Sequence, residues 1–441
     1  MTGQRDISQN ILPTSSRLHD VLARLNKGID GVVFIVDEEG MMVGMFTDGD
    51  SRRALLGGGK MDDPVEMHMN RRYVRASAGA SRQDNLKLLD GKVRHLPVLD
   101  DLGRPVDMIT WSELWRLPVM EPSLGGNELK YVSDCISSGW ISSQGTYVRK
   151  FEEAFAEYHG VPHAISVCNG TAALHLALVA LGIGPGDEVI VPNLTFAASA
   201  NVVIHCGATP VLADVTLETW TLDPDQVERL ISPRTRAIMP VHLYGHPADM
   251  GPITALAEKH GLLVVEDNAE ALGAEYCGKK TGTLGDAGCF SFFANKVITT
   301  GEGGMITCRD AGLAHRIQVY RDHGMEKTRR YWHTVPGFNY RLTNLQAAIG
   351  LAQMEQLERF LSRRDEVVAL YDKGLREVPG IKLPPRAQWA RNIHWLYSIL
   401  VDEKAAGISR DALSTRLQDH GIETRPFFYP VHIQPPYERH A

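Results

Sequence analysis

The stretch Cys289-Phe290-Ser291-Phe292-Phe293-Ala294-Asn295-Lys296 brings a lysine out of an aromatic strand, and Thr299-Thr300-Gly301-Glu302-Gly303-Gly304 follows it. Apolar surroundings destabilise an ammonium ion, so a lysine placed here tends to supply the free amine that a Schiff base needs. The glycines let the backbone approach a ligand closely. For this segment alone, a surface lysine whose stem lies along apolar side chains is the alternative.

Two segments that precede the lysine carry complementary chemistry. Leu263-Val264-Val265-Glu266-Asp267 ends a very apolar strand in two carboxylates, at the edge of a parallel sheet where ligands bind. Cys168-Asn169-Gly170-Thr171 ends another strand and begins a helix, whose free N–H groups and Thr171 hydroxyl form a phosphate cradle. Taken singly, each segment is also compatible with an ordinary helix cap.

Together the three segments match the needs of one cofactor, pyridoxal 5'-phosphate (PLP). PLP requires a lysine for its Schiff base, a carboxylate for its pyridinium nitrogen and a cradle for its phosphate. The order of cradle, carboxylate and lysine resembles that of the PLP-dependent fold-type I enzymes. We therefore expect PLP, held by Lys296.

Strands and helices alternate from Glu121 onward, which predicts an α/β fold with a mainly parallel sheet between helices. A helix is expected over Thr146–Tyr158, ended by Gly160, and a long helical region after Thr343. HWLYSILVD, residues 394–402, is typical of a strand, and a helix is expected over Ser409–His420. The predicted strands of the sheet are His163–Val167, Glu188–Pro192, Pro210–Val215, Ala237–His242 and Leu262–Glu266.

From about Glu121 to its end, the chain resembles the DegT/DnrJ/EryC1/StrS family of nucleotide-sugar aminotransferases. The segments that carry the resemblance are SGWISSQGTYVRKFEEAF, NGTAALHLALVALGIGPGDEVIVPNLTFAASAN, PVHLYGHPADM, EDNAEALGA, FSFFANKVITTGEGGM and GFNYRLTNLQAAIG. They cover nearly all of this part of the chain. Sugar dehydratases of the same family carry histidine in place of the lysine, so Lys296 favours transamination.

The resemblance assigns roles to individual residues. Lys296 matches the lysine that binds the cofactor and acts as general acid–base, and Asp267 matches the partner of the pyridinium nitrogen. Glu270 stands near the ring hydroxyl, and Phe196 stands where a side chain stacks on the ring. Gly170, Thr171 and Ser291 match residues that contact the cofactor phosphate. Asn339 and Arg341 lie in the segment that family members insert into the neighbouring subunit's site. A homodimer with active sites at its interface is therefore implied.

Within this family, SGWISSQGTYVRKFE and RYWHTVPGFNYRLTNLQAAIG are most similar to the GDP-perosamine synthases. The resemblance implies a GDP-linked 4-keto-6-deoxymannose as substrate and glutamate as amino donor. Tyr331, Trp332 and His333 lie near the substrate in that comparison, although packing roles suit them equally. A dTDP- or UDP-linked sugar, a PLP enzyme that acts on amino acids alone, and a non-catalytic regulatory protein with a retained PLP fold are the alternatives.

An internal repeat precedes these segments. FIVDEEGMMVGMFTDGD, starting at Phe34, has a partner about 63 residues later in PVLDDLGRPVDMITWSE, starting at Pro97. Each copy predicts a strand, a tight Asp/Gly turn, a strand and a short helix, and the copies should pack together. Residues 12–118 resemble a tandem CBS pair, which implies an adenine-nucleotide site with Thr47, Asp50, Thr110 and Glu113. A spacer or a dimerising element is the alternative.

Composition sets the broad class. With 441 residues and 22% charged side chains, the chain should fold into several domains: 1–118 as the CBS module, 119–378 as the PLP-binding large domain and 379–441 as a small domain that is shorter than is usual in the family. The net charge of −7 argues against nucleic-acid binding. The apolar stretches are shorter than a membrane span requires, so a cytoplasmic protein is expected. We expect no metal, and six reduced cysteines in the core.

Overall fold

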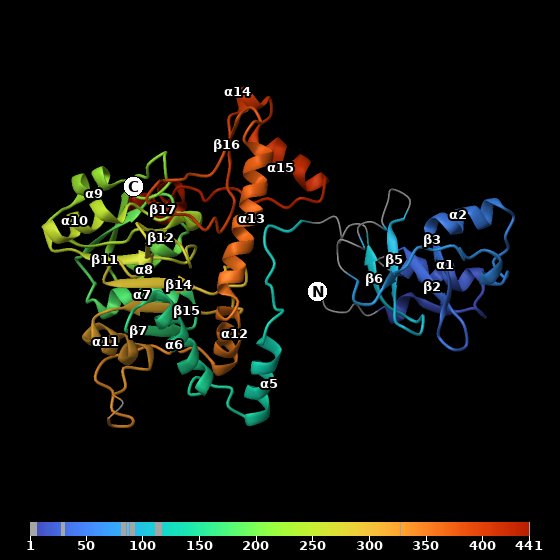
Figure 1. Cartoon of the computed structure of the whole chain (residues 1–441), viewed down its shortest axis with the longest axis horizontal. Coiled ribbons are helices and arrows are strands. Elements are labelled where there is room, and N and C mark those ends of the chain that lie inside the picture. Colours follow the sequence, from blue (N-terminus) through green and yellow to red (C-terminus); the bar gives the residue numbers. More distant parts are fainter. Residues whose placement is uncertain are drawn as a thin grey trace. The chain divides into compact units, whose positions relative to one another are not determined.

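Seven strands form the central sheet, in the order β7-β15-β14-β11-β10-β8-β9 (Figure 1). β15 runs antiparallel to both of its neighbours, whereas the other adjacent strands are parallel to each other. The computed structural model describes residues 7–27, 31–80, 85, 88, 93–110, 117–326 and 328–440. The strands are β7 His163–Val167, β8 Glu188–Pro192, β9 Thr209–Ala213, β10 Thr235–Ile238, β11 Leu263–Asp267, β14 Ala287–Ser291 and β15 Gly304–Cys308.

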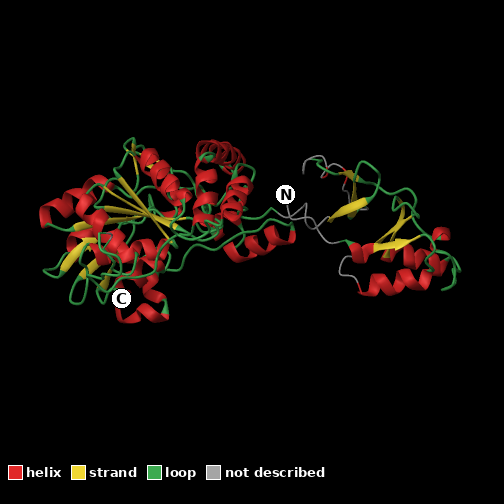
Figure 2. Cartoon of the chain, turned by 90° about the horizontal axis from the view of Figure 1, so that it is seen from below, coloured by secondary structure: helices red, strands yellow, loops and turns green. Residues whose placement is uncertain are grey.

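Apolar residues fill both faces of this sheet, which explains why its strands are continuous apolar runs. Val265 packs against one layer of helices, α7, α8 and α11, whereas its neighbour Val264 packs against the other face, with α9 and α10. Phe290 faces a third cluster with α6, α12 and α13. Figure 2 shows the strands of this part between helices. The helices are α6 Thr146–His159, α7 Gly170–Ala180, α8 Ala198–His205, α9 Pro224–Leu230, α10 Met250–His260, α11 Ala311–Arg321, α12 Asn344–Met354 and α13 Leu357–Leu375.

The remaining elements of this part are short or peripheral. Helix α5 (Glu128–Ser138) packs on α12. Small sheets pair β12 (Glu275–Tyr276) with β13 (Lys279–Lys280) and β17 (Ala390–Arg391), and β16 (Ile381–Lys382) with β18 (Leu400–Val401). Helix α14 covers Glu403–Ala406. The strand expected over residues 394–402 is therefore wrong for all but Leu400–Val401, because the backbone N–H groups of His394 and Asp402 bond to a side chain and to a turn instead.

The chain divides into two compact units: Met1–Val119 with Asp411–Thr424, and Met120–Arg410 with Arg425–Ala441. The first unit contains α15 (Arg410–Asp419), the helix expected near residue 409, next to the bridge between Leu117 and Ile422. No boundary separates a large from a small domain within the second unit's described residues, so the division at residue 378 stays a prediction.

Two copies of one small unit make up residues 7–110, as the repeat predicted for the two strands and the turn of each copy, whereas the short helix expected after the second copy lies outside the described residues. The first copy contains β1 (Ile11–Pro13), α1 (Leu18–Lys27), β2 (Val32–Val36), β3 (Met42–Thr47) and α2 (Asp48–Leu56); the second contains β4 (Ala76–Ser77), β5 (His95–Leu99) and β6 (Pro105–Thr110). Val32 pairs with Thr47, and His95 pairs with Thr110 in the same register. The Met42 N–H donates to the Gly103 carbonyl, so the copies form one module.

The turns of the two copies share their hydrogen bonds as well. Asp37 Oδ1 accepts from the N–H groups of Glu39 and Met41, and Asp100 Oδ1 accepts from those of Leu102 and Arg104. The glycines Gly40 and Gly103 have φ angles of 80° and 78°, a conformation that side chains with a Cβ rarely adopt. Aspartate and glycine at these spacings therefore dictate the turn in both copies.

Three of the six cysteines are buried, Cys168 and Cys206 are half-buried, and Cys277 is exposed, so the expectation of core thiols is wrong for Cys277. Cys277 lies in the tight turn between β12 and β13, with a φ of 47°, and such connections run over the protein surface. Within the described ranges, no helix is both long and apolar enough to cross a membrane, and no group of three His, Cys, Asp or Glu side chains is placed to hold a metal ion.

Candidate active site

The carboxyl ends of β7, β14 and β11 lie at one edge of the sheet, where the predicted site residues meet. Asp267 is the last residue of β11, and Lys296 lies in the loop after β14. The Lys296 Nζ atom lies 3.9 Å from Glu270 Oε1, and the two side chains are only 13% and 6% exposed. The structure thus brings together an amine and two carboxylates that the sequence had predicted as one site.

Burial shifts the protonation of all three groups. It lowers the pKa of Lys296, and the charges of Glu270 and Asp267 oppose that shift. It raises the pKa of Glu270 to about 7, against the charge of Lys296 and an N–H bond from Tyr244. It also raises the pKa of Asp267, against hydrogen bonds from Ala269 and Ser199. Desolvation therefore favours the uncharged form of each of the three groups.

The phosphate cradle lies where α7 begins. Asn169 caps the helix by accepting from the Ala172 N–H, so the N–H groups of Gly170 and Thr171 in the first turn are left for an anion. A Cβ at Gly170 would lie 2.7 Å from the Ser291 Cβ, so the cradle requires glycine. Thr171 is exposed. The three residues predicted to contact phosphate are thus neighbours at the same helix end.

Aromatic side chains form a series of ring contacts that ends at the amine. Phe196, predicted to stack on the ring, is 59% exposed, and its ring centroid lies 5.7 Å from that of Phe428. The Lys296 Nζ atom lies 3.8 Å from the ring centroid of Trp395, which stacks at 6.4 Å on Tyr244. Trp395 and Tyr244 were not predicted from the sequence. Tyr244 stands in the PVHLYGH segment that carried the family resemblance. For Trp395, the aromatic run HWLY was the one signal in the sequence.

Two hydrogen bonds orient the Asp267 carboxylate. Its Oδ2 accepts from the Ser199 hydroxyl at 2.8 Å, and its Oδ1 accepts from the Ala269 N–H at 3.1 Å. Ser199 also bonds to the Thr195 hydroxyl at 3.0 Å. Ser199 was missed in the sequence, although it lies three residues after Phe196 and could have been found as a buried hydroxyl on α8. The carboxylate is thus oriented before any ligand binds.

Asn339 and Arg341 lie on a segment that passes beside the cradle, because the Cys168 N–H donates to the Tyr340 carbonyl at 2.8 Å. Arg341 donates to Asn339 and pairs with Asp322 at 2.9 Å, and its Nη2 lies 3.4 Å from the His323 Nε2. These partners are not the residues around Lys296. The two residues therefore form a separate polar group within this chain.

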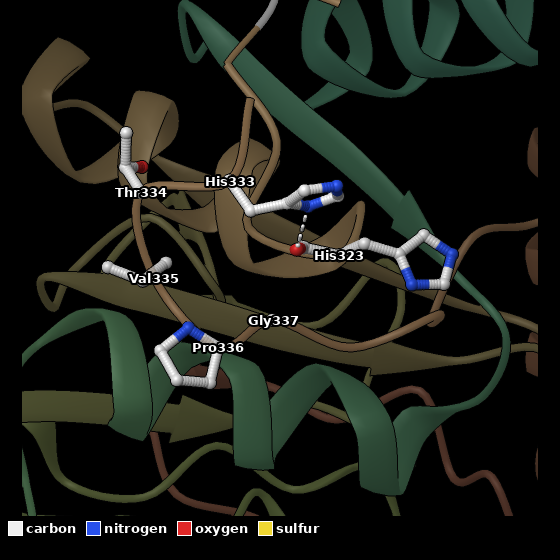
Figure 3. A pocket seen from close by; sticks show the side chains of 6 residues that line it. All are labelled: His323, His333, Thr334, Val335, Pro336 and Gly337. Carbon is white, nitrogen blue, oxygen red and sulfur yellow. Dashed lines mark hydrogen bonds between the residues drawn. The ribbon is translucent and has the colours of Figure 1, made fainter. Parts of the chain in front are cut away.

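A surface hollow of about 580 Å³ lies on the same segment (Figure 3). His333 points its Nδ1 at the His323 carbonyl at 2.8 Å. Trp332 is 50% exposed and Tyr331 72% exposed, each with an arginine over its ring, Arg329 at 4.0 Å and Arg330 at 4.9 Å. The hollow is lined by His323, His333, Thr334, Val335, Pro336 and Gly337.

In the CBS-like module, Thr47 and Asp50 form a capping box at the start of α2. Thr47 donates its N–H and hydroxyl to Asp50 Oδ2, and Arg53 pairs with the other carboxylate oxygen. Thr110 ends β6 and is buried. Glu113 lies outside the described residues. Thr47 and Asp50 thus contact each other, whereas the pairing of Thr110 with Glu113 stays a prediction.

Comparison with known proteins decides the family. The model of the DegT/DnrJ/EryC1/StrS aminotransferase family matches residues 122–441. The chain belongs to this family. A CBS domain model matches residues 10–57 and 65–114, so the N-terminal module of this DegT/DnrJ/EryC1/StrS chain is a tandem CBS pair.

Known members of the DegT/DnrJ/EryC1/StrS family share most of the second unit. A GDP-perosamine synthase from Caulobacter vibrioides is 54% identical over 327 residues, which cover 74% of this chain and 88% of the relative. DesV from S. venezuelae, solved with a ketimine intermediate, is 40% identical with a TM-score of 0.67, over 71% of this chain and 82% of that chain. Spr1654, a putative sugar aminotransferase from Streptococcus pneumoniae solved in a PLP form, is 30% identical with a TM-score of 0.69, over 74% and 88%.

The DegT/DnrJ/EryC1/StrS chain is therefore a PLP-dependent sugar aminotransferase by family, with a fold that matches solved PLP aminotransferases. Its own residues fit the cofactor. One edge of the sheet carries a buried carboxylate, a mostly buried lysine and a helix start at which a Cβ on Gly170 would clash with Ser291. Asp267 would hold the ring nitrogen, Lys296 the aldehyde carbon, and Gly170 with Thr171 the phosphate.

Proposed function

We propose that this enzyme transfers the amino group of glutamate to C4 of GDP-4-keto-6-deoxymannose and so forms GDP-perosamine. The observation that carries the proposal is the 54% identity to a GDP-perosamine synthase over most of the aminotransferase part. The cluster of Lys296, Glu270 and Asp267 supports it, since these groups suffice for the proton transfers of a transamination. A dTDP- or UDP-linked 4-keto-6-deoxy sugar is the second candidate, because solved relatives include an enzyme crystallised with a TDP-sugar product.

PLP, when bound, supplies an electron sink that stabilises negative charge on the substrate carbon. Asp267 would keep the ring nitrogen protonated, and the hydrogen bond from Ser199 favours the ionised form of Asp267, against the effect of burial. Lys296 Nζ takes a proton from the glutamate α-carbon in the first half-reaction and delivers a proton to sugar C4 in the second. Glu270 lies 3.9 Å from Nζ and can exchange a proton with it, since burial raises the pKa of Glu270 to about 7.

Visible absorbance of the purified protein tests this function. Glutamate should bleach the band of the bound cofactor, and GDP-4-keto-6-deoxymannose should restore it. Recovery with only a dTDP- or UDP-linked keto sugar would assign the enzyme to that second candidate. If glutamate bleaches the band and no nucleotide sugar restores it, an enzyme that acts on amino acids alone is favoured. Absence of any band after addition of PLP refutes the proposal and favours a non-catalytic role.

We also propose that the enzyme works as a homodimer. Helix α5 and the turn after it expose apolar side chains: Leu129 is 80% exposed, Ile136 64% and Trp140 58%. An apolar strip of this kind normally lies against another surface. Light scattering should give twice the mass of one chain, and Ile136→Asp should shift it toward the monomer, whereas Leu217→Asp, elsewhere on the surface and 75% exposed, should not.

For the CBS pair we propose an adenine-nucleotide site at Thr47, Asp50, Thr110 and Glu113. The support is the family match and the adjacent Thr47 and Asp50 side chains. Calorimetry with ATP and AMP tests it. Heat that disappears in Asp50→Ala supports the site, and no heat with either nucleotide leaves the module a role in assembly alone.

A further inference from the structure

Trp395 provides a surface for the amine of Lys296. The Nζ atom lies 3.8 Å from the centre of the indole ring, within the range of cation–π attraction. Trp395 is 5% exposed, so water does not screen this contact. The indole comes from a segment about 100 residues after the lysine, so the contact depends on the tertiary fold.

Neighbouring residues fix the indole ring in this position. Its Nε1 donates to the carbonyl of Asn295, the residue before Lys296, at 2.8 Å. Its ring lies at an angle of 16° to the Tyr244 ring. The Trp395 carbonyl accepts from Arg364 at 3.0 Å. The ring therefore holds its place and its orientation without help from Lys296.

Two carboxylates compete for the same ammonium group. Among the described residues, the charged groups that act on Lys296 are Glu270 and Asp267. An ammonium paired directly with Asp267 would neutralise the charge that the cofactor's ring nitrogen needs. The Asp267 oxygens instead accept from Ser199 and Ala269, while the lysine lies over the indole. These hydrogen bonds of Asp267 leave the amine to the indole face and to Glu270.

We propose that Trp395 is a positioning residue that holds the Lys296 amine over its indole face whenever the lysine is not bonded to the cofactor. This inference rests on the role of Lys296 in the proposed function. In each half-reaction the lysine must leave the cofactor and stay near the substrate carbon, and a fixed aromatic face gives it a defined place. A tryptophan that only fills space would have no electrostatic effect on the amine.

Fluorination of the indole separates these two roles, because fluorine withdraws electron density from the ring face with little change of shape. The full chain is produced with tryptophan, a monofluorinated tryptophan or a difluorinated tryptophan, and freed of cofactor. Trace acetylation with acetic anhydride across a pH range, read by peptide mass spectrometry, then gives the midpoint pH for the reaction of Lys296. The matched control is Trp395→Phe produced with the same three amino acids, since all seven tryptophans are replaced together. Trp389→Phe, which removes an indole that packs on His246 and Tyr276, is the second control.

The midpoint should fall with each fluorine, by about half a pH unit in all, because the protonated amine loses attraction from the ring. In Trp395→Phe the midpoint should be the same with all three amino acids, and in Trp389→Phe the fall should persist. A midpoint that does not change with fluorination, or that changes equally in Trp395→Phe, overturns the proposal. The labelling needs no turnover, so it separates a failure of this inference from a failure of the proposed function.

Discussion

Lys296 Nζ and Glu270 Oε1 lie 3.9 Å apart in a part of the molecule that water hardly reaches. Burial lowers the pKa of the lysine and raises the pKa of Glu270 to about 7. The two groups therefore approach each other in proton affinity, which neither would do on the surface. Proton exchange between them is correspondingly easier than between the same two groups on the surface.

Glu270→Gln should change the pH dependence of stability. A raised pKa contributes stability that is fully present below about pH 4.5 and is lost as the pH rises through about 7. Glutamine does not ionise, so the variant does not lose this stability. The variant should therefore be more stable relative to the natural chain at pH 8 than at pH 5.5, by about 2 kcal/mol. Denaturant unfolding of the cofactor-free chain at the two pH values measures this difference.

Glu228→Gln is the control for that experiment. Glu228 is exposed and pairs with Lys259 at 2.7 Å, and that hydrogen bond lowers its pKa. A lowered pKa contributes stability at pH values above the ordinary pKa of the group. This variant should therefore lose stability slightly at pH 8 rather than gain it. The same relative gain at both pH values in Glu270→Gln would contradict the raised pKa.

Lys296→Ala and Lys296→Arg should both abolish turnover, by at least about a thousandfold, because neither side chain supplies a free amine at Nζ. Formation of 2-oxoglutarate from glutamate with a keto sugar measures this loss. The fold of Lys296→Ala should persist, since removal of the buried amine relieves a desolvation cost. Circular dichroism checks the fold, and turnover within tenfold of the natural chain would show that the lysine is not the proton carrier.

Ser199→Ala should weaken cofactor binding about tenfold. The hydroxyl donates to Asp267 Oδ2 at 2.8 Å, and its loss raises the pKa of Asp267 further, so less of the carboxylate is ionised. Titration of the stripped protein with PLP, followed by visible absorbance, gives the affinity. Ser138→Ala, which removes a hydroxyl from the exposed end of α5, is the matched control. Unchanged affinity in Ser199→Ala would refute the orienting role of the serine.

Gly170→Ala should impair the phosphate cradle. The new Cβ would lie 2.7 Å from the Ser291 Cβ, so α7 or β14 must shift, and we expect a loss of more than about tenfold in PLP affinity with about 1–3 kcal/mol of stability. Gly374→Ala in α13 meets no atom within 4 Å and should instead raise stability by about 0.5–1 kcal/mol. Equal PLP affinity in the two variants would show that the cradle lies elsewhere.

The sheet was predictable because its strands are buried on both faces. β7 and β8 occupy the predicted ranges His163–Val167 and Glu188–Pro192. β10 ends at Ile238, four residues earlier than predicted, because the following residues lead into the turn around Tyr244. The repeat was predictable for another reason: aspartate and glycine at fixed spacing dictate the same turn in both copies.

Residues that act through the tertiary fold could not be predicted in the same way. Lys296, Asp267 and Gly170 stand next to strand ends, so local sequence indicates their place. Trp395 belongs to a segment with an apolar pattern that suggested a strand, yet it makes its contacts from a loop that no local propensity describes. Ser199 is one hydroxyl in a helix of small residues, and only the position of Asp267 gives it a role.

The insertion of β15 between β7 and β14 has a consequence for how the enzyme is made. Val167 pairs with Gly304, so the strand that leads into the cradle finds its neighbour only after about 140 further residues have left the ribosome. Contacts so distant along the chain form slowly, because a long loop must close first. Gly170 follows β7 and Ser291 ends β14, the two strands that β15 joins. We therefore expect cofactor capture to be a late event of biogenesis, so that retention of PLP reports a sheet that has finished assembling.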